Sequence, residues 1–125
     1  MNYIWVFKME DKNEILDLSF EFALAIIRYC DLLEENRKYV LSRQLLASGT
    51  SIGANVREAQ NAESSADFIH KLKIAAKEAD ETQYWLQLCK QSDNYPDPAH
   101  LLPQLESIKK LLNTIIATMK RKINS

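Results

Sequence analysis

Apolar residues recur at intervals of three and four along most of the chain, which is the spacing of one face of an α-helix. Clusters of turn-forming residues at 34–37, 63–67 and 92–98 divide this pattern into four stretches. The predicted helices run from Asp11 or Lys12 to Glu34, from Lys38 to Asn61, from Ser64 or Ser65 to Gln91, and from Ala99 or Pro103 to Lys122. Four helices with short connections predict an all-α fold, an antiparallel up-down-up-down four-helix bundle.

One stripe of each helix is expected to form the core. The stripe of the third helix is the most regular and consists of Phe68, Leu72, Ala75, Ala79, Thr82, Leu86 and Cys89. The first three helices carry more apolar residues than one core stripe needs, and contiguous exposed apolar patches usually mark an interface. This surplus predicts a cyclic homo-oligomer, although oblique helix crossings could also bury it within one chain. The candidate subunit-interface residues are Phe20, Ile27, Leu46, Gly49, Gly53, Ile74, Trp85 and Leu88.

Gly49 and Gly53 are the only two glycines in the chain. Their spacing of four places them on one side of the second helix, where each costs about 1 kcal/mol relative to alanine. Because glycine destabilises a helix, its presence here indicates that another backbone packs closely against this side of the helix. Because they lie beside the predicted core stripe, we expect that approach at a second contact, between subunits.

The composition fits one globular domain without a strong field of either sign. The chain has 125 residues, 46% of them hydrophobic, and a net charge of −1. Residues 11–125 are predicted to form a single bundle domain, and the apolar residues 1–10 an extended tail. Cys30 and Cys89 are predicted to be reduced, buried thiols, which suits a cytoplasmic protein. No apolar run is long enough to cross a bilayer, so no membrane partner is expected.

Polar residues flank the core stripes of the second and third helices. Gln44, Ser51 and Asn55 are expected to meet Glu78 and Glu81 in a structural network that fixes helix register. An alternative hypothesis treats the two glutamates as an acid–base pair, which would need a cleft and shifted pKa values. We favour the structural role, so no catalytic residue is predicted.

The two histidines do not form a predicted metal site. A di-metal bundle needs carboxylates and Glu-x-x-His pairs that point inward, whereas His70 lies opposite its core stripe and His100 follows a proline-rich turn. We therefore predict no metal and no cofactor. Basic residues offer a different candidate, since phosphate contacts could add up around a ring. The candidate nucleic-acid-binding residues are Arg43, Arg57, Lys71, Lys73, Lys77, Lys109 and Lys110.

Two long runs resemble the signatures of a known family. They are LSRQLLASGTSIGANVREA at residues 41–59 and DFIHKLKIAAKEADETQYWL at residues 67–86. They are similar to bacterial four-helix-bundle proteins named for reading frames in intervening sequences of 23S ribosomal RNA genes. The resemblance implies a cytoplasmic bundle that assembles into a ring, typically a pentamer, with no established enzymatic activity. A related branch, the accessory proteins of diversity-generating retroelements, forms a basic pentameric barrel that binds nucleic acid; this chain departs from it in its net charge of −1.

Together these observations predict a non-enzymatic, ring-forming scaffold or adaptor. The alternative is an accessory protein that binds structured RNA or DNA through basic patches repeated around the ring. A third class, an enzyme with a carboxylate site at Glu78 and Glu81, has less support. The expected partners are copies of the chain itself, with RNA, DNA or an unidentified protein as further candidates.

Overall fold

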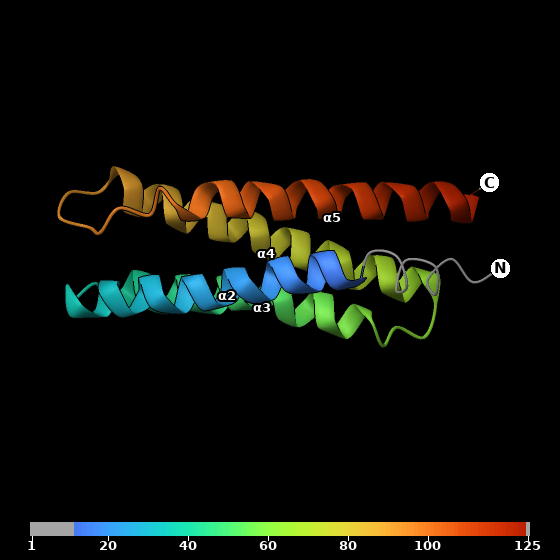
Figure 1. Cartoon of the computed structure of the whole chain (residues 1–125), viewed down its shortest axis with the longest axis horizontal. Coiled ribbons are helices and arrows are strands. Elements are labelled where there is room, and N and C mark those ends of the chain that lie inside the picture. Colours follow the sequence, from blue (N-terminus) through green and yellow to red (C-terminus); the bar gives the residue numbers. More distant parts are fainter. Residues whose placement is uncertain (1–11, 125) are drawn as a thin grey trace.

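The computed structural model describes residues 12–124, which form four long helices. The helices are α2 (Lys12–Glu35), α3 (Tyr39–Ala59), α4 (Ser65–Gln91) and α5 (Leu101–Asn124). Successive helices run in opposite directions, as Figure 1 shows. The predicted all-α, up-down-up-down bundle is confirmed, and each helix begins and ends close to its predicted limits. The predicted tail at residues 1–10 lies outside the described residues.

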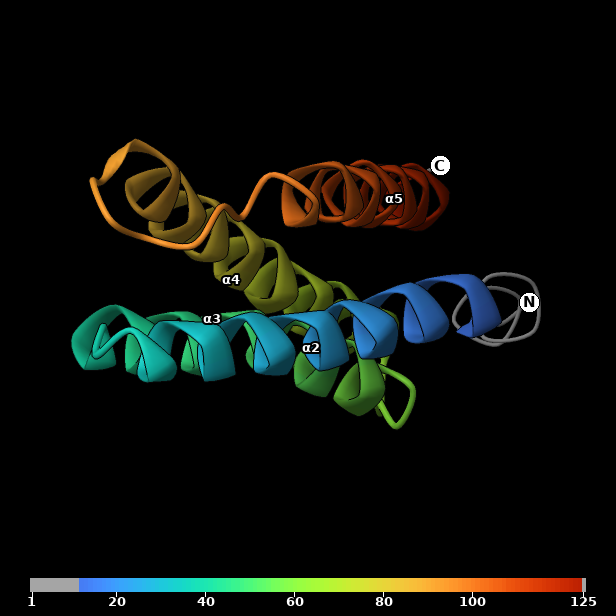
Figure 2. The ribbon, with the colours of Figure 1, turned by 60° about the vertical axis from the view of Figure 1, so that its left-hand side comes forward.

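α3 has two long helix neighbours. It packs against α2 and α4, while α5 packs against α4 and, over a smaller contact, against α2. In Figure 2, α4 runs obliquely between the α2–α3 pair and α5. The four helices therefore close into a bundle in which each helix contacts two others.

The predicted stripes form one continuous core. All seven residues of the α4 stripe are buried, as predicted. Leu18 of α2 and Leu41 of α3 are half-buried and pack against the edge of this core. The largest fully buried side chains are Tyr29, Phe22, Ile26, Leu33, Leu45, Ile52, Leu72, Leu86, Leu101, Leu105, Ile108 and Leu112.

Polar contacts define the ends of the helices. The backbone N–H of Asp67 donates to the Ser64 hydroxyl over 3.1 Å, so Ser64, one of the two serines predicted to begin this helix, is its cap. At the opposite end of the bundle, the buried Tyr29 hydroxyl donates to the Pro96 carbonyl over 2.6 Å. Burial raises the pKa of Tyr29, so the hydroxyl keeps its proton and holds the α4–α5 connection against α2.

Both glycines lie at the contact between α2 and α3. A Cβ atom added to Gly49 would lie 2.9 Å from two side-chain carbons of Ile26. A Cβ atom added to Gly53 would lie 3.3 Å from the backbone carbonyl oxygen of Ser19. The prediction that the glycines serve a contact between subunits is therefore wrong. Their missing side chains allow a close approach within one chain.

We predict that Gly49→Leu lowers the free energy of unfolding by about 2–3 kcal/mol, because the new side chain must displace the fully buried Ile26. Ala47→Leu is the matched control, since Ala47 is exposed on the same helix and substitutions at such positions usually change stability by less than about 0.5 kcal/mol. Chemical denaturation of both variants measures the difference. Equal stabilities would contradict the close packing of α2 on α3.

Candidate functional site

Several large apolar side chains are exposed along the outside of α2 and α3. Phe20 is 57% exposed, Ile27 41% and Leu46 39%, and all three belong to the predicted interface. Leu24, 39% exposed, joins them on α2, since it follows Phe20 by one helical turn. We call Phe20, Leu24, Ile27 and Leu46 the α2/α3 face. Leu24 was missed as an interface candidate, although the regular spacing of 20, 24 and 27 could have indicated it.

A groove borders this face near the beginning of α2. It has a volume of about 210 Å³ and opens between α2 and α3. Its lining consists of Leu16, Ser19, Phe20, Ala23, Thr50, Gly53, Ala54 and Arg57. Apart from Leu16, Phe20 and Arg57 these residues are small, so the groove exists because α2 and α3 carry few bulky side chains where they face each other.

The remaining interface candidates lie elsewhere. Ile74, Trp85 and Leu88 belong to α4, which packs on α3 and α5, and all three are half-buried. Trp85 packs against the core, and its indole nitrogen is buried without a hydrogen-bond partner among residues 12–124. Beside it, Tyr84 is 54% exposed, with its ring edge-on to the indole and the ring centroids 5.1 Å apart. The structure therefore divides the predicted interface between two surfaces.

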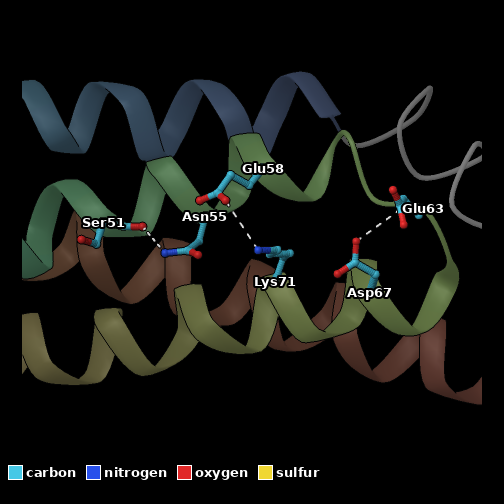
Figure 3. A network of polar contacts seen from close by, with 6 residues as sticks. All are labelled: Ser51, Asn55, Glu58, Glu63, Asp67 and Lys71. Carbon is cyan, nitrogen blue, oxygen red and sulfur yellow. Dashed lines mark hydrogen bonds and ion pairs between the residues drawn. The ribbon is translucent and has the colours of Figure 1, made fainter.

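The predicted polar network does not form as expected. The Ser51 hydroxyl donates to the Ala47 carbonyl over 2.6 Å, and the Asn55 amide donates to the Ser51 carbonyl over 2.9 Å. Figure 3 shows this second bond running along α3. Both side chains thus bond back to their own helix, a common outcome for Ser and Asn. The predicted pairing of these side chains with the glutamates of α4 is wrong.

Other residues connect α3 to α4. The hydroxyls of Ser48 and Thr82 lie 2.9 Å apart in the core and share a hydrogen bond. Nearer the surface, Lys71 forms an ion pair with Glu58 over 3.5 Å, also visible in Figure 3. The hydroxyl pair could have been suspected from Ser48 and Thr82 on their core stripes, where a polar side chain needs a partner.

The carboxylates proposed for acid–base chemistry are not enclosed together. Glu78 is half-buried, and its pKa is raised by desolvation and then by the negative charge of Glu81. Glu81 itself is exposed, as is Gln44 on α3. None of the pockets described for residues 12–124 is lined by Glu78 or Glu81. These pockets therefore give no support to acid–base chemistry at the two residues.

The candidate basic residues have unlike surroundings. Lys71 is paired with Glu58, and Lys109 lies 3.0 Å from Asp80 and also bonds Gln83. The exposed side chains of the set are those of Arg43, Arg57, Lys73, Lys77 and Lys110.

Lys73 is the basic candidate with the most distinctive site. Together with His70 and Lys120 it lines a pocket of about 310 Å³ whose apolar part includes Ile69 and Ile123. The close contact with Lys120 lowers the pKa of Lys73. Two ammonium groups thus face each other at this pocket.

The described residues offer no evident metal site. Across residues 12–124, no three His, Cys, Asp or Glu side chains gather closely enough to hold a metal ion. His70 and His100 are both exposed. Cys30 and Cys89 are buried free thiols, and burial raises the pKa of Cys30 to about 11. Among these helices none is sufficiently long and apolar to cross a bilayer.

Comparisons with known proteins agree with the fold. A protein of Bacteroides thetaiotaomicron VPI-5482, whose crystal structure is described as that of a protein with unknown function from the S23 ribosomal protein family, is 46% identical. The match covers 82% of this chain and 97% of that chain, with a TM-score of 0.78. Among proteins with curated descriptions, none matches this chain. The sequence model of the family described as "23S rRNA-intervening sequence protein" matches residues 11–114, so the chain belongs to that family.

Proposed function

We propose that the chain is a non-enzymatic scaffold that assembles into a homo-oligomeric ring, a pentamer on the family resemblance, in the bacterial cytoplasm. The observation that carries this proposal is the α2/α3 face, where Phe20, Leu24 and Ile27 of α2 and Leu46 of the adjacent α3 expose apolar surface. Burying such a patch against another copy stabilises an assembly by roughly 25 cal/mol for each Å² of apolar area removed from water.

The two separate apolar surfaces suit a ring. In a ring, each subunit contacts its neighbours through two different patches, whereas a twofold dimer uses one patch twice. The α2/α3 face would supply one patch. The second would lie on α4, where Tyr84 is exposed beside Trp85 and Leu88 is half-buried. Free, buried thiols are compatible with a reducing compartment.

We predict that Ile27→Asp reduces the mass of the protein in solution to that of a single chain. A charge at this exposed position would be left unpaired in the apolar contact, while the fold of the subunit would be kept. Leu32→Asp is the matched control, because Leu32 is similarly exposed on α2 but lies five residues on, about 140° around the helix. Light scattering measures both masses, and circular dichroism checks helicity. A monomeric parent protein would refute assembly, and an unchanged mass for Ile27→Asp would refute this face.

A second candidate function is binding of structured RNA or DNA, and the pocket at His70, Lys73 and Lys120 favours it. A phosphate placed between the two lysines would replace a repulsive contact by two attractive ones. In a ring the pocket would be repeated in every subunit, so weak contacts could combine along one nucleic acid. Lys71 and Lys109 contribute less to this candidate, because carboxylates already neutralise them.

We predict that the double variant Lys73→Glu, Lys120→Glu weakens binding of a structured RNA. Affinity falls as salt rises, and we expect the slope of log affinity against log salt concentration to become shallower by about 2, roughly one for each lost phosphate contact. Arg28→Glu with Lys90→Glu gives the same change in net charge at exposed sites outside the pocket. Titrations at several salt concentrations compare the two. Equal losses in both variants would mean nonspecific attraction, and no binding by the parent at low salt would remove this candidate.

A further inference from the structure

The sequence before α2 contains an unusual apolar run. Tyr3, Ile4, Trp5, Val6 and Phe7 follow one another, and Lys8, Met9, Glu10 and Asp11 separate them from the helix. These residues lie outside those that the structure describes, and residues 1–10 also lie outside the family match, which begins at residue 11. Five consecutive apolar side chains in water are costly, so they favour a nearby surface on which to be buried.

The groove between α2 and α3 offers such a surface. It lies on the bundle's outside, and its volume of about 210 Å³ is below the roughly 300 Å³ at which pockets for separate small molecules begin. A space of this size suits one or two side chains. Its walls include Leu16, Ala23 and Gly53, and Arg57 stands at the lining with no ion pair among residues 12–124.

The length of the chain fits the groove. Its lining on α2 extends from Leu16 to Ala23, which at about 1.5 Å per residue lies roughly 6–17 Å from the first residue of the helix. Phe7 and Trp5 precede Lys12 by five and seven residues, which span at most about 16–23 Å of extended backbone. A segment that turns back just before Lys12 can therefore place both aromatic rings over the groove.

We propose that residues 3–7 fold back along α2 and dock in the α2/α3 groove of their own chain. Attachment to the adjacent helix end gives the segment a high effective concentration at its own groove. The charges are complementary, because Glu10 and Asp11 stand between the apolar run and α2 in the sequence, and Arg57 lines the groove. The docked segment covers Leu16 to Ala23, and with them Phe20 of the α2/α3 face, and leaves Leu24, Ile27 and Leu46 of that face free for assembly.

A single tryptophan reports on this docking. The chain has two tryptophans, so Trp85→Phe leaves Trp5 alone. We expect Trp5 to be shielded from acrylamide quenching in this background, and Ala54→Glu to raise the quenching rate several-fold by placing a charge in the groove. Ala47→Glu is the matched control, exposed one heptad earlier on α3 and outside the groove. Quenching as fast as in a free peptide of residues 1–11, or an equal response to both variants, would overturn the proposal.

A second measurement does not depend on Trp85→Phe. It distinguishes docking of the segment on its own chain from docking on another copy of the chain. Phe7→Cys combined with Ala54→Cys is expected to form a disulfide, which requires Cα atoms within about 7 Å. The native thiols, Cys30 and Cys89, are buried and do not compete. A cross-linked product with the mass of one chain supports docking within the chain. A product of two chains, or no product, overturns it.

The same variants keep this inference distinct from the proposed assembly. Ala54→Glu should leave the mass in solution unchanged, because Ala54 lies in the groove beyond the Ile27 and Leu46 part of the face. Ile27→Asp should leave the protection of Trp5 unchanged. Loss of both properties in either variant would mean that the segment docks only in the assembled ring, against the proposal.

Discussion

The closeness of α2 and α3 is the constraint on which the rest of the bundle depends. Gly49 gives room to the buried side chain of Ile26, and Gly53 to the backbone of α2 at Ser19. Ser42 and Cys30 reinforce the pair, since each side chain donates to the other's carbonyl oxygen. At these two positions the packing of α2 leaves no space for a side chain on α3. The exposed apolar residues of the α2/α3 face lie outside this contact, on the surface of the same two helices.

The α2/α3 face and the groove beside it connect the packing of the helices with the two proposals made for this surface. At one end of the face, small residues leave a groove beside the start of α2; farther along, Ile27 and Leu46 project from adjacent helices. The volume of the groove matches that of one or two side chains. The projecting residues are large and apolar, and oligomers commonly bury such residues at their interfaces. The proposed docking of the N-terminal segment and the proposed ring contact thus use different parts of one surface, and both arise from the same helix packing.

Much of the architecture could be predicted, because a repeat of three and four directly reports which side of a helix is buried. Phe68, Leu72 and Leu86 are buried as their spacing required, and Ser64 caps α4 as its side chain allows. The polar contacts were predicted less well. The side chains of Ser51 and Asn55 form hydrogen bonds to carbonyl groups of their own helix. Their positions in the sequence are equally consistent with hydrogen bonds to α4. The contact between α3 and α4 is made by Ser48 and Thr82 instead.

The sequence by itself determined the number of helices, their limits, their core stripes and the family, since each depends on residues close together in the chain. Only the tertiary structure decided which neighbour each flank of a helix meets. Gly49 and Gly53 were recognisable as sites of close approach, but a helical pattern has no information about whether the approaching backbone belongs to the same chain. The packed bundle places α2 there, and it divides the apolar surplus between the α2–α3 pair, which carries Phe20, Ile27 and Leu46, and α4, which carries Trp85 and Leu88.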